Sequence, residues 1–225
     1  MAAAHQFGTG PLARTSAIVY TLLVTEFWLL VTAGPGLAAV LLLGRDASNL
    51  PLVAACLAPA GPALSAALFA LHHRGAELAD LHPTAAFWRG YRLNALGALR
   101  VCVPWLAVLT MVAMILVHRR SSGVPGWWAA LLVLLAVAAC LWLSNAMVIT
   151  SLFRFRAIDV ARLAAYFLGR TPRVTLGNAG LLILAAAVTA AATEGALFLL
   201  VPVFGLALLH NSRTLIAQVR QDFVA

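Results

Sequence analysis

Charged residues are scarce in this chain. Only 10% of its 225 residues are charged, while 63% are hydrophobic and the mean hydropathy is +0.97. A soluble globular protein carries about 25% charged residues. With so little charge, the chain cannot cover a hydrophobic core with polar surface. The composition therefore excludes a soluble domain and predicts an integral membrane protein.

Lysine is absent, and Asp and Glu together number seven. The fifteen basic residues are all Arg, which leaves a net charge of +8. Such an excess would indicate nucleic-acid binding in a soluble protein, but in a membrane protein the basic loops set the orientation. We therefore expect no nucleic-acid partner. An Arg-only, Ala-rich composition is typical of a GC-rich bacterial genome, so we expect a multi-pass protein of the bacterial plasma membrane.

Cysteine is also rare, and catalytic motifs are missing. Cys56, Cys102 and Cys140 lie inside apolar runs without a C-x-x-C pair, which excludes a disulfide framework and indicates buried small residues. The chain contains no H-E-x-x-H, G-x-S-x-G, P-loop or G-x-G-x-x-G sequence. We expect no enzyme activity, no cofactor and no metal site.

Long hydrophobic runs are abundant. A helix needs about 20 apolar residues to cross the bilayer. Six runs meet or approach this length, and they predict an all-α, polytopic membrane helix bundle that forms a single domain over residues 1–225. The expected spans are residues 15–43, 51–72, 94–117, 126–150, 174–192 and 195–211.

The last two spans are parts of one apolar run over residues 174–210. As a single helix this run would be about 55 Å long, nearly twice the thickness of the hydrocarbon core. We therefore expect a hairpin that turns at Thr193, Glu194 and Gly195 and places Glu194 at the membrane surface.

The distribution of Arg predicts the orientation, because basic loops stay in the cytoplasm. With the N-terminus inside, twelve arginines are cytoplasmic, and only Arg45, Arg119 and Arg120 are outside. Six spans keep both termini on the same side. We therefore expect both termini in the cytoplasm.

Two loops on the cytoplasmic side predict short interfacial helices. Residues 127–168 contain neither Gly nor Pro, so the fourth span is expected to continue or bend into a cytoplasmic helix that ends at Gly169. Pro83 is expected to open a second short helix. The two segments share arginines and aromatic residues, and the candidate contact residues are Phe87, Trp88, Arg89, Tyr91, Arg92, Asn94, Arg154, Arg156 and Arg162. Two interpretations remain open: contact with anionic lipid of the cytoplasmic leaflet, or docking of a cytoplasmic partner.

Glu26 is the only acidic residue deep in an expected span. A carboxylate in the bilayer is costly unless it is protonated, paired or facing water, so Glu26 is a candidate functional residue with Arg100 as a candidate partner. The alternative is a structural hydrogen bond between helices, which we also expect for Asn145 and Asn178.

Gly and Pro are expected to interrupt the first two helices. The elements are Gly34, Pro35 and Gly36 in the first span, and Pro59, Gly61 and Pro62 in the second. Interrupted helices can bind ions through freed backbone groups when they line a cavity. Alternatively, such elements kink a helix or let a neighbouring helix approach closely.

Two stretches resemble the domain-of-unknown-function family 624, also called the YesL-like family. They are Gly61-Pro62-Ala63 and the sequence FWRGYRLN at residues 87–94, so the likeness covers the first half of the chain. The family often has Asn near the position of Glu26, and here the chain departs from it. The resemblance implies several spans, no established activity and an accessory role beside a carbohydrate ABC transporter.

Three functions therefore remain open. The first is an accessory protein that binds ABC transporter subunits through its cytoplasmic loops. The second is a small autonomous transporter or channel that forms a homo-oligomer. Glu26 and the Gly-Pro elements would line its transport path. The third is a lipid-binding protein that structures the membrane.

Overall fold

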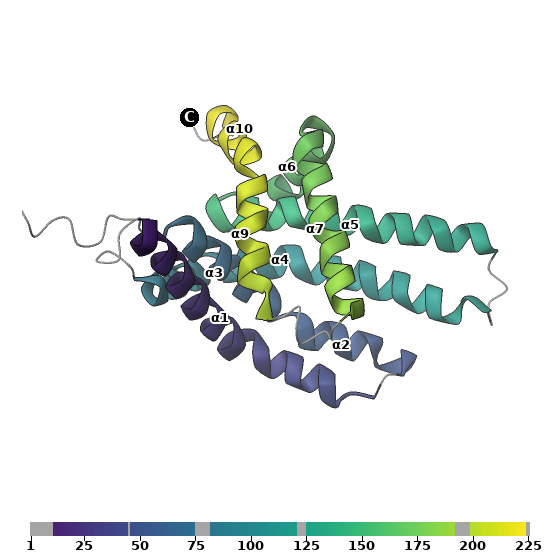
Figure 1. Ribbon diagram of the computed structural model, residues 1–225. Helices are drawn as coiled ribbons and strands as arrows, with labels where there is room; N and C mark the ends of the chain where they lie inside the picture. Colours follow the sequence, from purple (N-terminus) through teal and green to yellow (C-terminus); the bar gives the residue numbers. More distant parts are fainter. Residues whose placement is uncertain (1–10, 45, 75–81, 121–124, 192–198, 224–225) are drawn as a thin grey trace, which may run out of the picture.

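The computed structural model describes residues 11–44, 46–74, 82–120, 125–191 and 199–223. These residues are helical throughout, with short connections and no strand among them (Figure 1). The predicted all-α class is confirmed. The helices are α1 (Pro11–Leu42), α2 (Leu50–Leu57), α3 (Ala60–His72), α4 (Pro83–Val117), α5 (Gly126–Leu152), α6 (Ala157–Arg170), α7 (Pro172–Ala191), α9 (Val201–Asn211) and α10 (Arg213–Phe223), with single 3-10 turns at Ala47–Asn49 and His118–Arg120.

Five helical segments are long and apolar enough to cross a membrane: Thr15–Leu42, Ala47–His72, Pro83–Val117, Gly126–Leu152 and Pro172–Ala191. They correspond to the first five expected spans. α9 has 11 residues, about 16 Å of helix, which is shorter than a span. The expected sixth span begins at residue 195, and the turn at residues 193–195 also lies outside the described residues.

α3 is the central helix of the bundle. It packs against α1, α4, α5 and α9, and nine of its thirteen residues are buried. Most of the buried residues are small, which lets the neighbouring helices approach closely. A Cβ on Gly61 would lie 2.7 Å from Sγ of Cys102 in α4, and one on Gly90 of α4 would lie 2.7 Å from Cβ of Phe69 in α3. Both glycines are therefore required by the α3–α4 contact.

The expected interruption of the first helix is wrong. α1 continues through Gly34, Pro35 and Gly36, because a membrane helix tolerates a proline when its surroundings compensate for the lost hydrogen bond. Gly36 instead provides close packing, since a Cβ there would collide with the backbone oxygen of Cys56 in α2. The second expected break is confirmed: α2 ends at Leu57 and α3 begins at Ala60, with Pro59 between them.

The expected short helix at Pro83 is also wrong, because α4 runs without a break from Pro83 to Val117. Its buried positions, which include Phe87, Asn94, Ala98 and Val101, recur at helical spacing, so one face packs along the whole first half of the helix. The expected bend after the fourth span is confirmed between α5 and α6.

The predicted stop at Gly169 is wrong, because α6 includes this residue and ends at Arg170. Thr171 follows in a non-helical conformation, and its hydroxyl donates a hydrogen bond to the Phe167 carbonyl at 2.7 Å. Pro172 then begins α7, so the helix boundary is set by Thr171 and Pro172.

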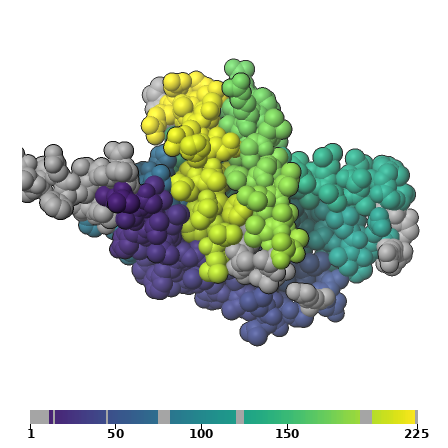
Figure 2. Space-filling model, in the orientation of Figure 1, coloured from purple at the N-terminus to yellow at the C-terminus, as the bar shows by residue number. Residues whose placement is uncertain are grey.

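The buried core lies toward one end of the molecule. In α5 the buried residues all lie in the segment 145–151, and in α4 all but Val112 lie before residue 103. The outer parts of α4 and α5 expose large apolar side chains, such as Met111 and Leu134, and form a hairpin that projects beyond the other helices (Figure 2). These exposed apolar surfaces fit contact with lipid tails.

Candidate functional site at the arginine-rich end

Most of the described arginines lie at one end of the molecule. They lie after α3, in the first turns of α4, at the α5–α6 junction, on α6, at the start of α7 and on α10. We call this region the arginine-rich end, and its residues are Arg74, Arg89, Arg92, Arg154, Arg156, Arg162, Arg170, Arg173, Arg213 and Arg220. Two cavities connect parts of it, one lined by Arg74, Arg89 and Arg154, the other by Arg74, Arg213 and Arg220.

The junction between α5 and α6 consists of the sequence FRFR at residues 153–156. Phe153 and Arg156 have extended backbone conformations, and side chains alternate in direction along an extended segment. Phe153 and Phe155 accordingly pack against the core with ring centroids 5.9 Å apart, while Arg154 and Arg156 are exposed. The alternation of Phe and Arg thus explains how the chain turns without Gly or Pro.

α6 is an amphipathic helix that lies at the arginine-rich end (Figure 1). Its buried face contains Val160, Leu163, Ala164 and Phe167, at the spacing of a helix that packs on one side. Its opposite face contains Ile158, Arg162, Ala165 and Tyr166, all exposed, with Ile158 at 59% and Tyr166 at 53%. This exposed face combines positive charge with large apolar side chains, as protein-binding surfaces often do.

The first turns of α4 divide the expected contact residues into buried and exposed ones. Phe87 is fully buried, and Trp88 and Tyr91 are half-buried. Trp28 of α1 contacts two of these residues. Its ring stacks on Phe87 with ring centroids 6.4 Å apart, and it meets Trp88 edge-on with centroids 5.1 Å apart. These aromatic residues join α4 to α1, and the prediction that Phe87 contacts lipid or a partner is wrong.

Asn94 is likewise buried, so it is not a surface contact residue. Its Nδ2 donates a hydrogen bond to the backbone oxygen of Ser151 in α5 at 2.9 Å. The Ser151 hydroxyl lies 2.9 Å from the Ser65 hydroxyl of α3. Asn94 therefore belongs to a polar link among three helices. Arg89 and Arg92 on the same stretch are exposed, as are Arg154, Arg156 and Arg162, and these five remain available for contacts.

A ladder of three asparagines joins α5, α7 and α9. Nδ2 of Asn178 donates to Oδ1 of Asn145 at 3.2 Å, and Nδ2 of Asn211 donates to Oδ1 of Asn178 at 2.8 Å. The expectation that Asn145 and Asn178 each form hydrogen bonds between helices is confirmed, and the structure shows that they bond to each other. Gly177 makes room for Asn211, since a Cβ at Gly177 would overlap the amide. Sequence reasoning missed Asn211, although the three asparagines are spaced at equal intervals along the chain.

Glu26 and Arg100 do not form the expected pair. Both carboxylate oxygens of Glu26 are buried without a hydrogen-bond partner, while Arg100 is exposed on α4. Glu26 is absent from the residues that line the cavities at the arginine-rich end. With α1 continuous, the structure offers no broken first helix beside Glu26.

The exposed arginines at the arginine-rich end can form charge-assisted hydrogen bonds with anionic groups. Within the described ranges, no group of three or more His, Cys, Asp or Glu residues could hold a metal ion. No protein family matches this sequence, and neither a curated protein nor a solved structure is detectably similar to it. The proposals below therefore depend on the residues, on their arrangement and, for the kind of partner, on the resemblance of residues 61–63 and 87–94 described above.

Proposed function

We propose that this chain is a non-catalytic accessory protein of a bacterial carbohydrate ABC transport system, and that it binds the transporter subunits through the exposed face of α6. The protein would have six spans, with both termini and the arginine-rich end in the cytoplasm. The observation that carries the proposal is the exposed face of α6, where Arg162 lies between Ile158 and Tyr166.

The orientation is supported by the distribution of arginines. Arg is concentrated at one end, and positively charged segments are retained on the cytoplasmic side. The opposite end carries Trp127 and Trp128 at the start of α5, both exposed. Exposed Trp residues at the end of a span are typical of the bilayer interface. α6 would then face the cytoplasm, where the ATPase subunits of a transporter reside.

The choice of a protein partner rests on the surface chemistry of α6. Arg and Tyr are enriched at protein interfaces, and an apolar side chain beside them adds buried area on binding. The family resemblance of residues 61–63 and 87–94 supports a transport system as the partner. Glu26 does not line the cavities at the arginine-rich end, and the helix that contains it, α1, is unbroken. The alternative of an autonomous transporter is therefore not favoured.

The experiment is chemical cross-linking in native membranes, followed by purification through a C-terminal tag and mass spectrometry. We expect permease and ATPase subunits of a carbohydrate transporter to co-purify with the wild type. Arg162→Glu should reduce their recovery at least tenfold. Arg213→Glu makes the same charge change on α10 and serves as the control, with recovery within about twofold of wild type. Recovery of the protein alone, or equal recovery with both variants, would contradict the proposal.

A further inference from the structure

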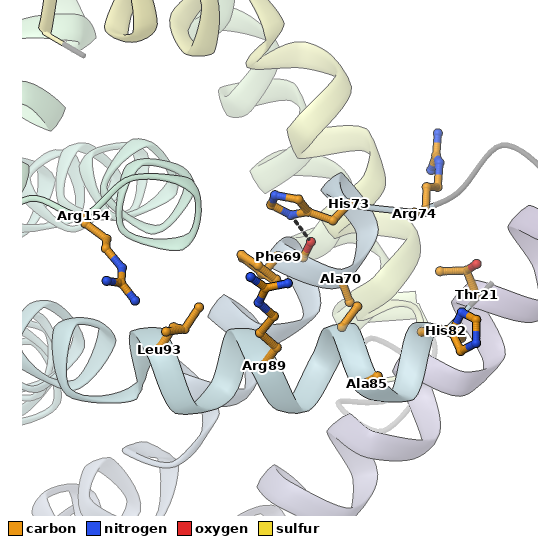
Figure 3. A pocket seen from close by; sticks show the side chains of 12 residues that line it. Thr21, Phe69, Ala70, His73, Arg74, His82, Ala85, Arg89, Leu93 and Arg154 are labelled. Atoms are coloured by element: carbon orange, nitrogen blue, oxygen red, sulfur yellow. Dashed lines mark hydrogen bonds between the residues drawn. The ribbon is translucent and has the colours of Figure 1, made fainter. Parts of the chain in front are cut away.

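A cavity of about 680 Å³ opens at the arginine-rich end between α1, α3, α4 and the α5–α6 junction (Figure 3). Its volume is in the range of small-molecule sites. Phe69, Ala70, Ala86 and Leu93 contribute apolar surface. The cavity is independent of the exposed face of α6, because none of the residues on that face lines it.

Three arginines from separate elements line this cavity. They are Arg74 after α3, Arg89 on α4 and Arg154 at the α5–α6 junction. Arg89 rises from α4 toward Phe69, and Arg154 reaches toward Leu93 on the same helix (Figure 3). Among the described residues that line the cavity, none is acidic. In the same view the Arg74 side chain points away from the other two arginines (Figure 3). Arg89 and Arg154 therefore carry the like charges that face this cavity, and like charges repel one another unless an anion neutralises them.

Arg74 adds evidence from burial. Its Nη1 atom is buried and has no hydrogen-bond partner. A buried donor without a partner is destabilising because it has lost its hydration, and the cost is larger when the donor is charged. A ligand that supplies acceptor oxygens would remove this cost.

His73 has a simpler role. Its Nδ1 lies 3.0 Å from the Phe69 carbonyl, and its ring stacks on Phe69 at 4.1 Å. The Phe69 carbonyl also accepts a hydrogen bond from the backbone N–H of His73 at 3.1 Å, so His73 adds a second contact to the last turn of α3. The contacts of His73 with Phe69 are within α3. They do not account for Arg89 and Arg154, which line the same cavity from α4 and from the α5–α6 junction.

We propose that this cavity binds the phosphate group of a phosphomonoester. Arginine forms paired hydrogen bonds with phosphate oxygens, and several arginines can contact the three terminal oxygens of one phosphate. The neighbouring apolar wall would contact the organic part of the ligand. The phosphate could belong to a lipid headgroup, because the cavity lies where the spans end, or to a soluble phosphorylated metabolite.

The test measures the thermal stability of the purified protein in nanodiscs at constant ionic strength. One set of phosphatidylcholine nanodiscs receives inorganic phosphate or glycerol 3-phosphate, and a second set contains phosphatidic acid in increasing amounts. We expect saturable stabilisation of the wild type in at least one set. Saturation with the soluble probes identifies a soluble ligand, and saturation with phosphatidic acid alone identifies a lipid headgroup.

Variants connect the effect to the cavity. The double substitution Arg89→Gln and Arg154→Gln should weaken binding at least tenfold, because it removes two charge-assisted contacts. Both side chains are exposed, so the stability without ligand should match that of the wild type. Arg173→Gln removes an exposed charge outside the cavity and should leave binding within about twofold. No stabilisation of the wild type by either probe, or equal weakening by Arg173→Gln, would overturn the proposal.

Discussion

At the scale of single residues, the asparagine ladder is the main polar connection inside the bundle. Asn178 is 2% exposed and lies in the middle, bonded to both Asn145 and Asn211. In a membrane, burying apolar surface does not drive helices together, so interhelical hydrogen bonds and close packing carry more of the association. The ladder therefore holds α5, α7 and α9 together.

We predict that Asn178→Leu lowers the free energy of unfolding by about 1–2 kcal/mol, because two interhelical bonds of about 0.6–1 kcal/mol each are lost while the side-chain volume is nearly kept. Unfolding in mixed micelles measures the change. Thr189→Val is the matched control on α7, since its hydroxyl bonds only to the Ala185 carbonyl of the same helix. An unchanged or higher stability of Asn178→Leu would contradict the role of the ladder.

Glu26 presents the opposite situation, a buried polar group without a partner. Both carboxylate oxygens lack hydrogen bonds, so the group is desolvated without compensation. We predict that Glu26→Leu raises the free energy of unfolding by about 1–3 kcal/mol. The same unfolding assay detects the gain. A loss of stability would show that the carboxylate makes a stabilising contact in the membrane.

The roles of some buried polar and aromatic residues could be predicted from the sequence, and the roles of others could not. Asn145 and Asn178 were predicted as interhelical partners because amides deep in apolar spans need hydrogen bonds. Asn211 was missed because it is the final residue of the last expected span, where an amide can reach polar surroundings. Asn94 and Phe87 were assigned to the surface because they stand beside arginines, although their spacing of seven places them on one face of α4.

At the scale of helices, close packing around α3 depends on two glycines. For Gly61 the sequence left open a helix break or a close approach of helices, and for Gly90 it indicated no structural role. Gly61 lies against Cys102, and Gly90 lies against Phe69. The same positions therefore act as contact points between α3 and α4.

We predict that Gly61→Ala destabilises the protein by about 1–3 kcal/mol, because the added methyl group overpacks the α3–α4 contact. Gly180→Ala is the control, since a Cβ at Gly180 has no neighbour within 4 Å. It should be neutral or stabilising by up to about 1 kcal/mol. Thermal denaturation in detergent compares the two variants, and equal effects would contradict the packing role of Gly61.

Helix faces were predictable only outside the membrane. The apolar positions of α6 and α10 recur at helical spacing, because one face of each meets the core and the other meets polar surroundings. The sequence assignment nevertheless missed α10. In the spans, both lipid and core favour apolar residues, so the sequence does not mark which side of α4 or α5 is buried. The continuity of α4 and the central place of α3 could not be derived for this reason.

At the scale of the whole molecule, the fold class followed from composition, whereas the arrangement of the helices did not. Few charges and long apolar runs are sufficient to predict a polytopic α-helical membrane protein. The clustering of arginines at one end was also predictable, since it depends on loop positions along the chain. One cavity is lined by Arg74, Arg89 and Arg154. It forms where α3, α4 and α5 pack, and this packing could not be predicted from the spacing of the arginines along the sequence.

The proposed function requires the arginine-rich end to face the cytoplasm, so the orientation is the most direct test of the account. Single cysteines are introduced as Gly126→Cys at the start of α5 and Ala165→Cys on α6, which follows the other end of α5. Both positions are exposed. Cys56, Cys102 and Cys140 remain in place, and the unchanged chain serves as the blank. A membrane-impermeant maleimide should label Gly126→Cys in intact spheroplasts and Ala165→Cys only after permeabilisation. Labelling of Ala165→Cys in intact spheroplasts would contradict the account.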